Sequence, residues 1–304
     1  MDRILINALA FYGLESAKAK LIRHYDNLVY KVEAEKVYAL RICPSVVNQK
    51  LKGEVDWLTA LRRDTNLLVP KPLPNKQGDL ISQLENRYCV LFEWLEGEPI
   101  SSIMSPKVAR QVGEIMAQLH LHAANYCLDD RMRDFTNCYD RDYFFGSNSW
   151  WQTKAKERLP NDYKGMRSGI EKARHLIESL DRSAEQFGII HSDLHFGNII
   201  CDGEKYAVID FGDCGIGYYL MDIAVTEAEF KDYYNGDLLI SAFREGYQDR
   251  RGYFPHGEDV RTFEVMSSLL LLEWIFESES DRVREDKAKW IAQIVKTIQE
   301  TSLV

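Results

Sequence analysis

The change in sequence pattern near residue 97 is the feature that most constrains how this chain folds. Before it, short runs rich in Val, Tyr, Ile and Leu are broken by Asp-Asn and Glu-Lys turns, a pattern typical of antiparallel strands. After it, longer runs carry apolar residues at helical spacing. The sequence therefore predicts an α+β protein with two lobes, in which a small antiparallel β-sheet lobe precedes a larger, mainly helical lobe.

Individual elements are expected at definite places in the first lobe. Strands are predicted over residues 17–26, 27–35, 36–43, 80–85 and 88–94. A helix is predicted over residues 48–63, because Leu51, Val55, Leu58 and Leu61 recur on one face. The apolar run that ends near residue 93 leads into an exposed turn, so we place the domain boundary there, between residues 1–96 and 97–304.

In the second lobe, Ser105 followed by Pro106 predicts the start of a helix that continues to about Ala123. Residues 125–165 are rich in aromatic side chains and are predicted to be irregular. A further helix is expected around residues 170–180, then a strand, a loop and a strand, and then helices to the end. A cleft between two lobes is a common place for a ligand, so we expect one here.

Composition limits the partners. The 304 residues include 45% hydrophobic and 28% charged residues, and the formal net charge is −9. Binding nucleic acid requires a basic surface, so we expect no nucleic-acid partner. No apolar run is long enough to span a membrane, so no membrane partner is expected. Six scattered cysteines without a C-x-x-C pair indicate reduced thiols and a cytoplasmic protein.

The stretch "IIHSDLHFGNIICDGEKYAVIDFGDCGIG" carries the chemistry, and it has two interpretations. In the first, His191, Asp193 and His195 alternate along a strand and bind zinc or iron, as in a metallohydrolase. Such a site needs further ligands, and the chain has no second histidine-rich cluster. His120 and His122 are two apart on a predicted helix and point from different faces.

In the second interpretation, the same stretch supports phosphoryl transfer. That reaction needs a carboxylate for the attacking hydroxyl, oxygen ligands for Mg²⁺ and a cation on the phosphates. Asp193 stands where a strand passes into a loop, and Asn198 follows five residues later. Asp210 closes the next predicted strand, and it faces that loop if the two strands pair as a hairpin. Asn and Asp oxygens are suitable ligands for Mg²⁺, so we favour this interpretation.

H-x-D-x-x-x-x-N followed by I-D-F-G resembles the catalytic and metal-binding segments of the aminoglycoside phosphotransferase and choline kinase family. The segments "NLVYKVEAEKVYALRICPS", "GEVDWLTAL", "VLFEWLEGE", "VGEIMAQLHLH" and "GYYLMDIA" also match it in order and spacing. The resemblance covers about residues 20–225 and implies the two-lobed protein-kinase-like fold. The last eighty or so residues resemble the family only in being predicted helices.

The resemblance implies roles residue by residue. Asp193 resembles the catalytic carboxylate, and Asn198 and Asp210 resemble the ligands of Mg²⁺. Arg41 stands at the position that in many kinases is a lysine on the nucleotide phosphates, and Glu54 pairs with it. An arginine suits this place because its planar guanidinium binds phosphate and carboxylate through two hydrogen bonds and keeps its charge.

The resemblance also implies nucleotide contacts in the segment between the lobes. There the carbonyl of Glu93 and the amide of Leu95 would meet the purine edge, with Phe92 just before them. No G-x-G-x-x-G motif covers the phosphates, so the backbone or side chains of Asp26 and Asn27 would have to do so.

Two further residues near the motif are of interest, one because it departs from the family pattern and one because it is expected to support the loop. Ser192 stands where the family commonly has glycine. Asp222 is expected to begin a helix and to brace the catalytic loop.

The function implied is a small-molecule kinase that uses Mg²⁺ and transfers the γ-phosphate of ATP or GTP to a hydroxyl group. The acceptor would be an aminoglycoside-like compound, an amino alcohol or a related metabolite, bound near residues 130–165 and the late helices. Acidic side chains there would favour a cation, namely those of Glu227, Glu229, Glu273 and Glu277. The aromatic residues of 143–151 are either packing residues or walls of the acceptor site.

Two alternatives of the same fold stay open at this point. A protein Ser/Thr kinase would need a platform for peptides, but the chain has no A-P-E-like segment and no long activation loop between Asp210 and Asp222. A nucleotide-binding pseudokinase would not need all three catalytic polar positions, which are intact here. The acceptor, the choice between ATP and GTP, and the oligomeric state are left open by the sequence.

Overall fold

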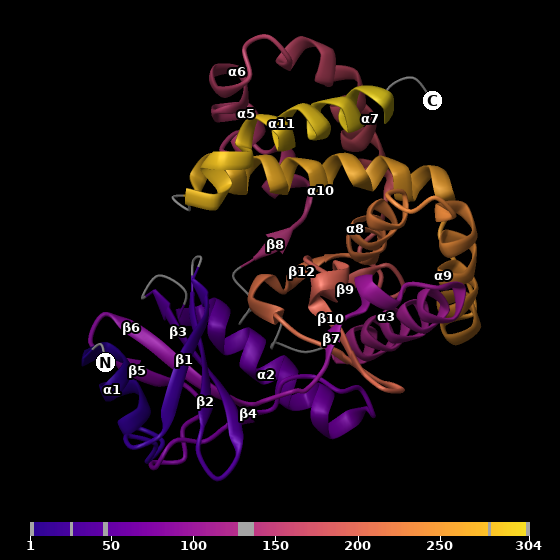
Figure 1. The fold of residues 1–304 in the computed structure, drawn as a ribbon. Helices are drawn as coiled ribbons and strands as arrows, with labels where there is room; N and C mark the ends of the chain where they lie inside the picture. Colours follow the sequence, from indigo (N-terminus) through magenta and orange to yellow (C-terminus); the bar gives the residue numbers. More distant parts are fainter. Residues whose placement is uncertain (1–2, 25–26, 45–47, 127–136, 279–280, 302–304) are drawn as a thin grey trace. The chain divides into compact units, whose positions relative to one another are not determined.

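The computed structural model describes residues 3–24, 27–44, 48–126, 137–278 and 281–301 (Figure 1). The chain divides into two compact units. The first unit contains the residues up to Ser102 and the later segment Gly197–Gly212, and the second contains most of the remainder. The α+β class is confirmed, since strands dominate the first unit and helices the second. The domain boundary after residue 96 stays a prediction, because the compact units interleave along the chain.

An antiparallel sheet is the centre of the first unit (Figure 1). Its strands are β1 (Lys18–His24), β2 (Leu28–Glu33), β3 (Val37–Pro44), β4 (Pro72–Leu73), β5 (Ser82–Leu84) and β6 (Arg87–Glu93). The order is β1-β2-β3-β6-β4, and β5 also pairs with β6. The predicted strands are therefore present, and β3 has a partner on both sides.

Two helices accompany this sheet, and only one of them was predicted. Helix α2 (Asn48–Asp64) occupies the place expected for it. Helix α1 (Arg3–Ala10) was not predicted, and it buries Leu5 and Leu9 in one core with Val32 and Leu40 of the sheet. A helix of 8 residues is too short to be stable alone, so its stability comes from this packing rather than from its local sequence.

A hairpin from later in the chain completes the first unit. Strands β10 (Ile199–Asp202) and β11 (Lys205–Val208) pair antiparallel, and β10 also pairs with β7 (Glu98–Pro99). The strand that ends before Asp210 thus forms a hairpin with the strand that follows Asn198. The strand that precedes Asp193 is not part of this hairpin. Gly97 has φ +141°, and a Cβ on it would lie 2.9 Å from the carbonyl of Cys201. Glycine is required there because β7 and β10 approach so closely.

The second unit consists mainly of helices. The long ones are α3 (Pro106–Tyr126), α7 (Tyr163–Ser179), α8 (Tyr219–Phe230), α9 (Gly236–Arg251), α10 (Gly257–Glu277) and α11 (Asp281–Thr301). Helices α10 and α11 lie side by side (Figure 1). A small sheet joins β8 (Cys138–Tyr139), β12 (Gly215–Tyr218) and β9 (Phe187–Ile190). None of the described helices is both long enough and apolar enough to cross a membrane.

The region predicted to be irregular contains short helices. They are α4 (Arg141–Phe145), α5 (Trp150–Thr153) and α6 (Ala155–Arg158). Asp140 caps α4 by accepting hydrogen bonds from the amides of Asp142 and Tyr143, and Ser149 caps α5 through the amide of Gln152. The prediction was therefore wrong for residues 141–158, because these local caps stabilise single turns that carry no helical periodicity. Residues 127–136 of the same region lie outside the described part of the chain.

Helices α3 and α9 pack with their backbones almost in contact. A Cβ on Gly113 would lie 2.0 Å from the carbonyl oxygen of Phe243, and a Cβ on Gly246 would lie 2.0 Å from that of Arg110. Real carbon and oxygen atoms do not approach so closely, so only glycine fits at both positions. The two glycines therefore set the distance between α3 and α9.

Replacing Gly113 should separate these helices. We expect Gly113→Ala to lower the free energy of unfolding by about 3 kcal/mol, because the added methyl group meets rigid backbone on α9. Urea unfolding followed by circular dichroism measures the change. Gly257→Ala is the matched control, because its Cβ would meet only the flexible end of Arg244, at 3.3 Å. Equal unfolding midpoints for the two variants would contradict the close packing.

Candidate active site

A buried ion pair links the sheet of the first unit to helix α2. Arg41 lies on β3, opposite Val29 of β2 and Val90 of β6. Its Nη2 donates to Oε2 of Glu54 at 2.5 Å, and the two side chains are only 8% and 3% exposed. Burial acts to lower the pKa of Arg41, but the surrounding negative groups, Glu54 foremost, together outweigh burial and raise that pKa above its usual value. The pairing predicted from the sequence is therefore present, and Arg41 stays charged.

Arg41 also retains a donor for a further partner. Its Nε is buried and has no hydrogen-bond partner within the part of the chain that the structure describes. Its guanidinium lies over the ring of Phe92, with Cζ 5.3 Å from the ring centroid. The carboxylate of Asp210 is close enough to contribute to the raised pKa of Arg41. A buried N–H without a partner is unfavourable, and the oxygen of an anionic ligand would satisfy it.

The two predicted metal ligands of the first unit lie on neighbouring backbone segments. The amide of Ile209 donates to the carbonyl of Asn198 at 2.9 Å, which holds Asn198 beside the residue that precedes Asp210. Asp210 has φ +63°, a left-handed conformation that is uncommon for residues other than glycine. The next residue, Phe211, packs edge-on against Trp57 of α2, with ring centroids 5.3 Å apart. The loop is therefore tied to the same helix that carries Glu54.

Arg23 belongs to this site and was not predicted. It lies near the end of β1 and forms an ion pair with the carboxylate of Asp210. The two residues are 187 positions apart in the chain, so no local pattern links them. The register of β1 against β2 shifts between Leu21 and Arg23, next to this residue.

The other predicted nucleotide contacts lie at the end of β6 and before β2. The amides of Glu93 and Trp94 donate to the carbonyls of Lys71 and Val37, at 3.0 and 3.3 Å. Leu95 follows them and is half-buried, as is Asn27. Asp26 lies outside the described residues. The roles of Phe92, Glu93, Leu95 and Asn27 in binding a nucleotide stay predictions.

The loop that carries Asp193, the predicted catalytic residue, lies in the second unit and follows β9. The amides of His191 and Ser192 both donate to the carboxylate of Asp222, at 2.9 and 2.6 Å. Ser192 has φ +70°, a left-handed conformation that glycine adopts more readily than a residue with a Cβ. Asp222 is fully buried in the first turn of α8. The prediction that Asp222 braces this loop is confirmed.

Asp193 itself is accessible. Its side chain is 41% exposed, and Oδ2 lies 3.6 Å from Nε2 of His195. His191 is fully buried, and its Nδ1 accepts a hydrogen bond from the amide of Asp193 at 3.3 Å. His191 is therefore a structural residue that shapes the loop. Among the described residues, no group of three or more His, Cys, Asp and Glu side chains is arranged to hold a metal ion.

A pair of tyrosines connects the second unit's loops to a glutamate on α10. Tyr139 donates from its hydroxyl to the carbonyl of Asp213 at 2.8 Å, and its ring lies edge-on to that of Tyr143, with centroids 5.3 Å apart. Tyr143 donates to Oε2 of Glu273 at 3.1 Å. Burial raises the pKa of Glu273, and the bond from Tyr143 partly opposes it. The sequence left open whether Tyr143 is a packing residue or a wall of the acceptor site, and this contact joins it to a carboxylate.

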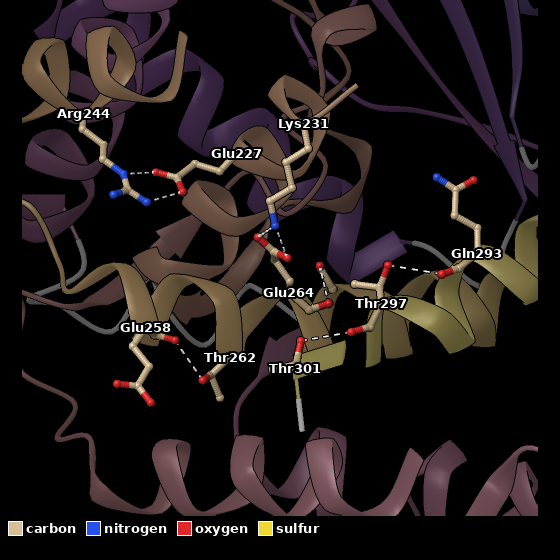
Figure 2. Close-up of polar contacts among 10 residues, drawn as sticks. Glu227, Lys231, Arg244, Glu258, Thr262, Glu264, Gln293, Thr297 and Thr301 are labelled. Atoms are coloured by element: carbon tan, nitrogen blue, oxygen red, sulfur yellow. Dashed lines mark hydrogen bonds and ion pairs between the residues drawn. The ribbon is translucent and has the colours of Figure 1, made fainter. Parts of the chain in front are cut away.

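The other acidic residues expected to favour a cation have partners in the protein. Arg244 binds both carboxylate oxygens of the buried Glu227, at 2.7 and 2.8 Å (Figure 2). Glu277 pairs with Lys154 at 2.8 Å, and Glu229 accepts from the amide of Phe196 at 2.5 Å. These three carboxylates therefore bind protein groups. Trp150 and Trp151, like Phe144 and Phe145, are buried and belong to the packing.

Comparison with known proteins agrees with this geometry. The phosphotransferase enzyme family matches residues 18–260, which is most of the chain. The chain belongs to this family. The resemblance and the two-lobed fold predicted from the sequence are thereby confirmed, and the metallohydrolase interpretation is wrong.

Curated relatives of this phosphotransferase-family chain are small-molecule kinases. An amicoumacin kinase of Bacillus subtilis (strain 168) is 22% identical over 236 residues, which are 74% of this chain and 66% of that protein. A homoserine kinase of Agrobacterium fabrum (strain C58 / ATCC 33970) is 28% identical over 149 residues, 48% of this chain and 42% of that protein. The chain thus spans less than two thirds of the length of these relatives.

Solved structures share the fold along nearly the whole chain. A microcompartment-associated aminopropanol kinase superposes with a TM-score of 0.80 at 23% identity, covering 98% of this chain and 95% of the other. A spectinomycin phosphotransferase in complex with ADP and spectinomycin has a TM-score of 0.68 at 15% identity, covering 99% and 98%. At these identities the likeness establishes the fold.

The buried ion pair makes a stability prediction. We expect Glu54→Gln to lower the free energy of unfolding by about 3 kcal/mol, because it leaves the buried charge of Arg41 without its counter-charge. Urea unfolding measures this. Asp56→Asn is the matched control on the same helix, because its pair with Lys52 is exposed and should contribute less than about 0.5 kcal/mol. If both variants unfold at the wild-type midpoint, the pair does not hold β3 to α2.

Proposed function

We propose that this protein is a kinase that transfers the γ-phosphate of ATP, or of GTP, to a hydroxyl group of a small molecule. One observation carries the proposal: the buried Arg41 keeps an N–H that has no partner among the described residues, while Asp210 and Asn198 lie in the same unit. Phosphoryl transfer requires this combination of a fixed cation and hard oxygen ligands.

The residues of the first unit fit a magnesium nucleotide. The carboxylate of Asp210 and the side-chain oxygen of Asn198 are hard ligands, which Mg²⁺ prefers. When bound, Mg²⁺ would neutralise the charge that develops on the phosphates. Arg41 would bind a phosphate oxygen through the free N–H, and Glu54 would hold its guanidinium in place. The exposed Arg23, which pairs with Asp210 here, adds a second cation to this group.

Asp193 would orient the acceptor hydroxyl and receive its proton as the phosphorus–oxygen bond forms. Its side chain is exposed enough to meet a ligand, whereas the backbone that carries it is anchored by buried bonds to Asp222. An exposed reactive group on a fixed backbone is what positioning of an acceptor requires.

We propose that the acceptor carries an amine as well as a hydroxyl group. Two relatives are named for homoserine and aminopropanol, both of which contain these two groups. In this chain, Tyr143 and Glu273 offer an aromatic face and a carboxylate in the second unit. An ammonium group is attracted by both, through the ring quadrupole and through charge. We also propose a cytoplasmic location, where ATP and reduced cysteines are found.

The metal-ligand proposal is tested on Asp210. We expect Asp210→Asn to abolish the binding of Mg-ATP, because the substitution keeps the size of the side chain and removes the charge that would hold the metal. Isothermal titration with the non-hydrolysable analogue AMP-PNP, with and without Mg²⁺, measures it. Asp202→Asn on the neighbouring hairpin is the control. If Asp210→Asn binds AMP-PNP with the same Mg²⁺-dependent affinity as wild type, Asp210 is not a metal ligand.

The reaction is tested by a panel of hydroxyl compounds with and without amines, scored by release of ADP or GDP. Amino alcohols should be the better acceptors. With the best of them, Asp193→Asn should lower kcat by at least about 100-fold, because it keeps the shape of the side chain and removes the proton acceptor. Nucleotide affinity should stay unchanged.

The same panel, with a serine-containing peptide added, separates the alternatives. Nucleotide binding without turnover of any acceptor would indicate a binding protein, and transfer to a peptide would indicate a protein kinase. Near-normal kcat in Asp193→Asn, at a melting temperature equal to that of wild type, would contradict the role of this residue.

A further inference from the structure

We propose that His120 and Tyr247 are positioning residues for phosphoryl transfer, which hold the catalytic loop in its working conformation through Asp222. The inference rests on the proposed function. It concerns three helices of the second unit, because His120 lies on α3, Asp222 on α8 and Tyr247 on α9.

A continuous set of hydrogen bonds joins these residues to the loop. Nδ1 of His120 lies 2.9 Å from the hydroxyl of Tyr247, and Nε2 lies 3.2 Å from Oδ2 of Asp222. The same carboxylate accepts the amides of His191 and Ser192, at 2.9 and 2.6 Å. His120, Asp222 and Tyr247 are all fully buried. Each donor in the set therefore depends on these bonds, because water does not reach them.

The proton positions follow from what each group is able to donate. An ionised carboxylate only accepts, so the amides and Nε2–H of His120 must all donate to Asp222. Burial lowers the pKa of His120, although Asp222 opposes it, and a neutral imidazole then has Nδ1 as an acceptor. Burial also raises the pKa of Tyr247, so its hydroxyl keeps the proton and donates to Nδ1. The hydroxyl of Tyr247 thereby selects the ring tautomer that serves Asp222.

The loop needs this support because its conformation is unfavourable by itself. Ser192 has φ +70°, which costs free energy for any residue with a Cβ, and its amide makes the shorter of the two bonds to Asp222. Asp193 follows directly, so a relaxation of φ at Ser192 would turn the backbone that carries its carboxylate. A displacement of about 1 Å at a reacting group is enough to lower a rate substantially.

The packing of the helices favours the same role. Gly246 precedes Tyr247 and contacts the backbone of α3, and Gly113 of α3 contacts the backbone of α9. This close approach brings the hydroxyl of Tyr247 within reach of a histidine on the other helix. Tyr219 stacks on the imidazole, with centroids 4.3 Å apart, and so fixes its plane. The ring is therefore held from one face, while its two nitrogens are held by two different helices.

The test uses three variants and one matched control. Tyr247→Phe removes only the hydroxyl, His120→Met removes both ring nitrogens, and His120→Gln restores a donor toward Asp222. Tyr218→Phe is the control, because Tyr218 is also buried but bonds to the carbonyl of Leu180, at 3.4 Å, outside this set. Two quantities are measured on each: hydrogen exchange of the His191 and Ser192 amides, and kcat with nucleotide KM.

We expect both amides to exchange faster in Tyr247→Phe and His120→Met, and slower again in His120→Gln. In the first two variants kcat should fall by about tenfold while nucleotide KM stays unchanged. Tyr218→Phe should match wild type in both measurements. The exchange measurement does not need turnover, so it tests the contacts even if the proposed kinase activity is wrong.

Three outcomes would overturn the proposal. Wild-type exchange of both amides in Tyr247→Phe would show that the hydroxyl does not act on Asp222. Faster exchange with unchanged kcat would show that the set stabilises the loop without positioning Asp193. An equal loss of kcat in Tyr218→Phe would show that any buried tyrosine has this effect.

Discussion

The ion pair between Arg41 and Glu54 is the interaction on which the first unit depends. It joins the central strand β3 to α2 inside the protein, where an unpaired charge would be strongly unfavourable. Helix α2 in turn holds the loop of Asp210 through the contact of Trp57 with Phe211. Helix α2 thus contacts both Arg41, the proposed cation for the phosphates, and the loop that carries Asp210, a proposed metal ligand.

In the second unit a different buried carboxylate, that of Asp222, holds the loop before Asp193. Asp222 binds two backbone amides and a histidine instead of an arginine. A buried charge bound by neutral donors is also costly to disturb, because each bond removed leaves a buried group without a partner. In both units, therefore, a buried carboxylate on a helix holds a group of the candidate site: Glu54 holds the guanidinium of Arg41, and Asp222 holds the backbone that leads to Asp193.

How much could be predicted depends on how local each signal is. The strands of the sheet, helix α2 and the motif residues Asp193, Asn198 and Asp210 were found because their patterns lie within short stretches. Arg23 was missed because its partner Asp210 is 187 positions away. Helix α1 and the capped turns of residues 141–158 were missed because packing and single side-chain caps stabilise them. Three of the four glutamates expected to favour a cation bind protein groups, namely Arg244, Lys154 and the amide of Phe196, and composition does not reveal such partners.

The sequence by itself determined the fold class, the family and the residue types available for phosphoryl transfer, since strand and helix periodicity and the spacing of H-x-D-x-x-x-x-N are local properties. Only the tertiary structure decided which of these residues are fixed and by what. It showed that Arg41 keeps an N–H without a partner among the described residues, that Ser192 is held at positive φ, and that His120 and Tyr247 meet at Asp222. These facts depend on contacts between segments far apart in the chain, and such contacts arise only when burial brings the segments together.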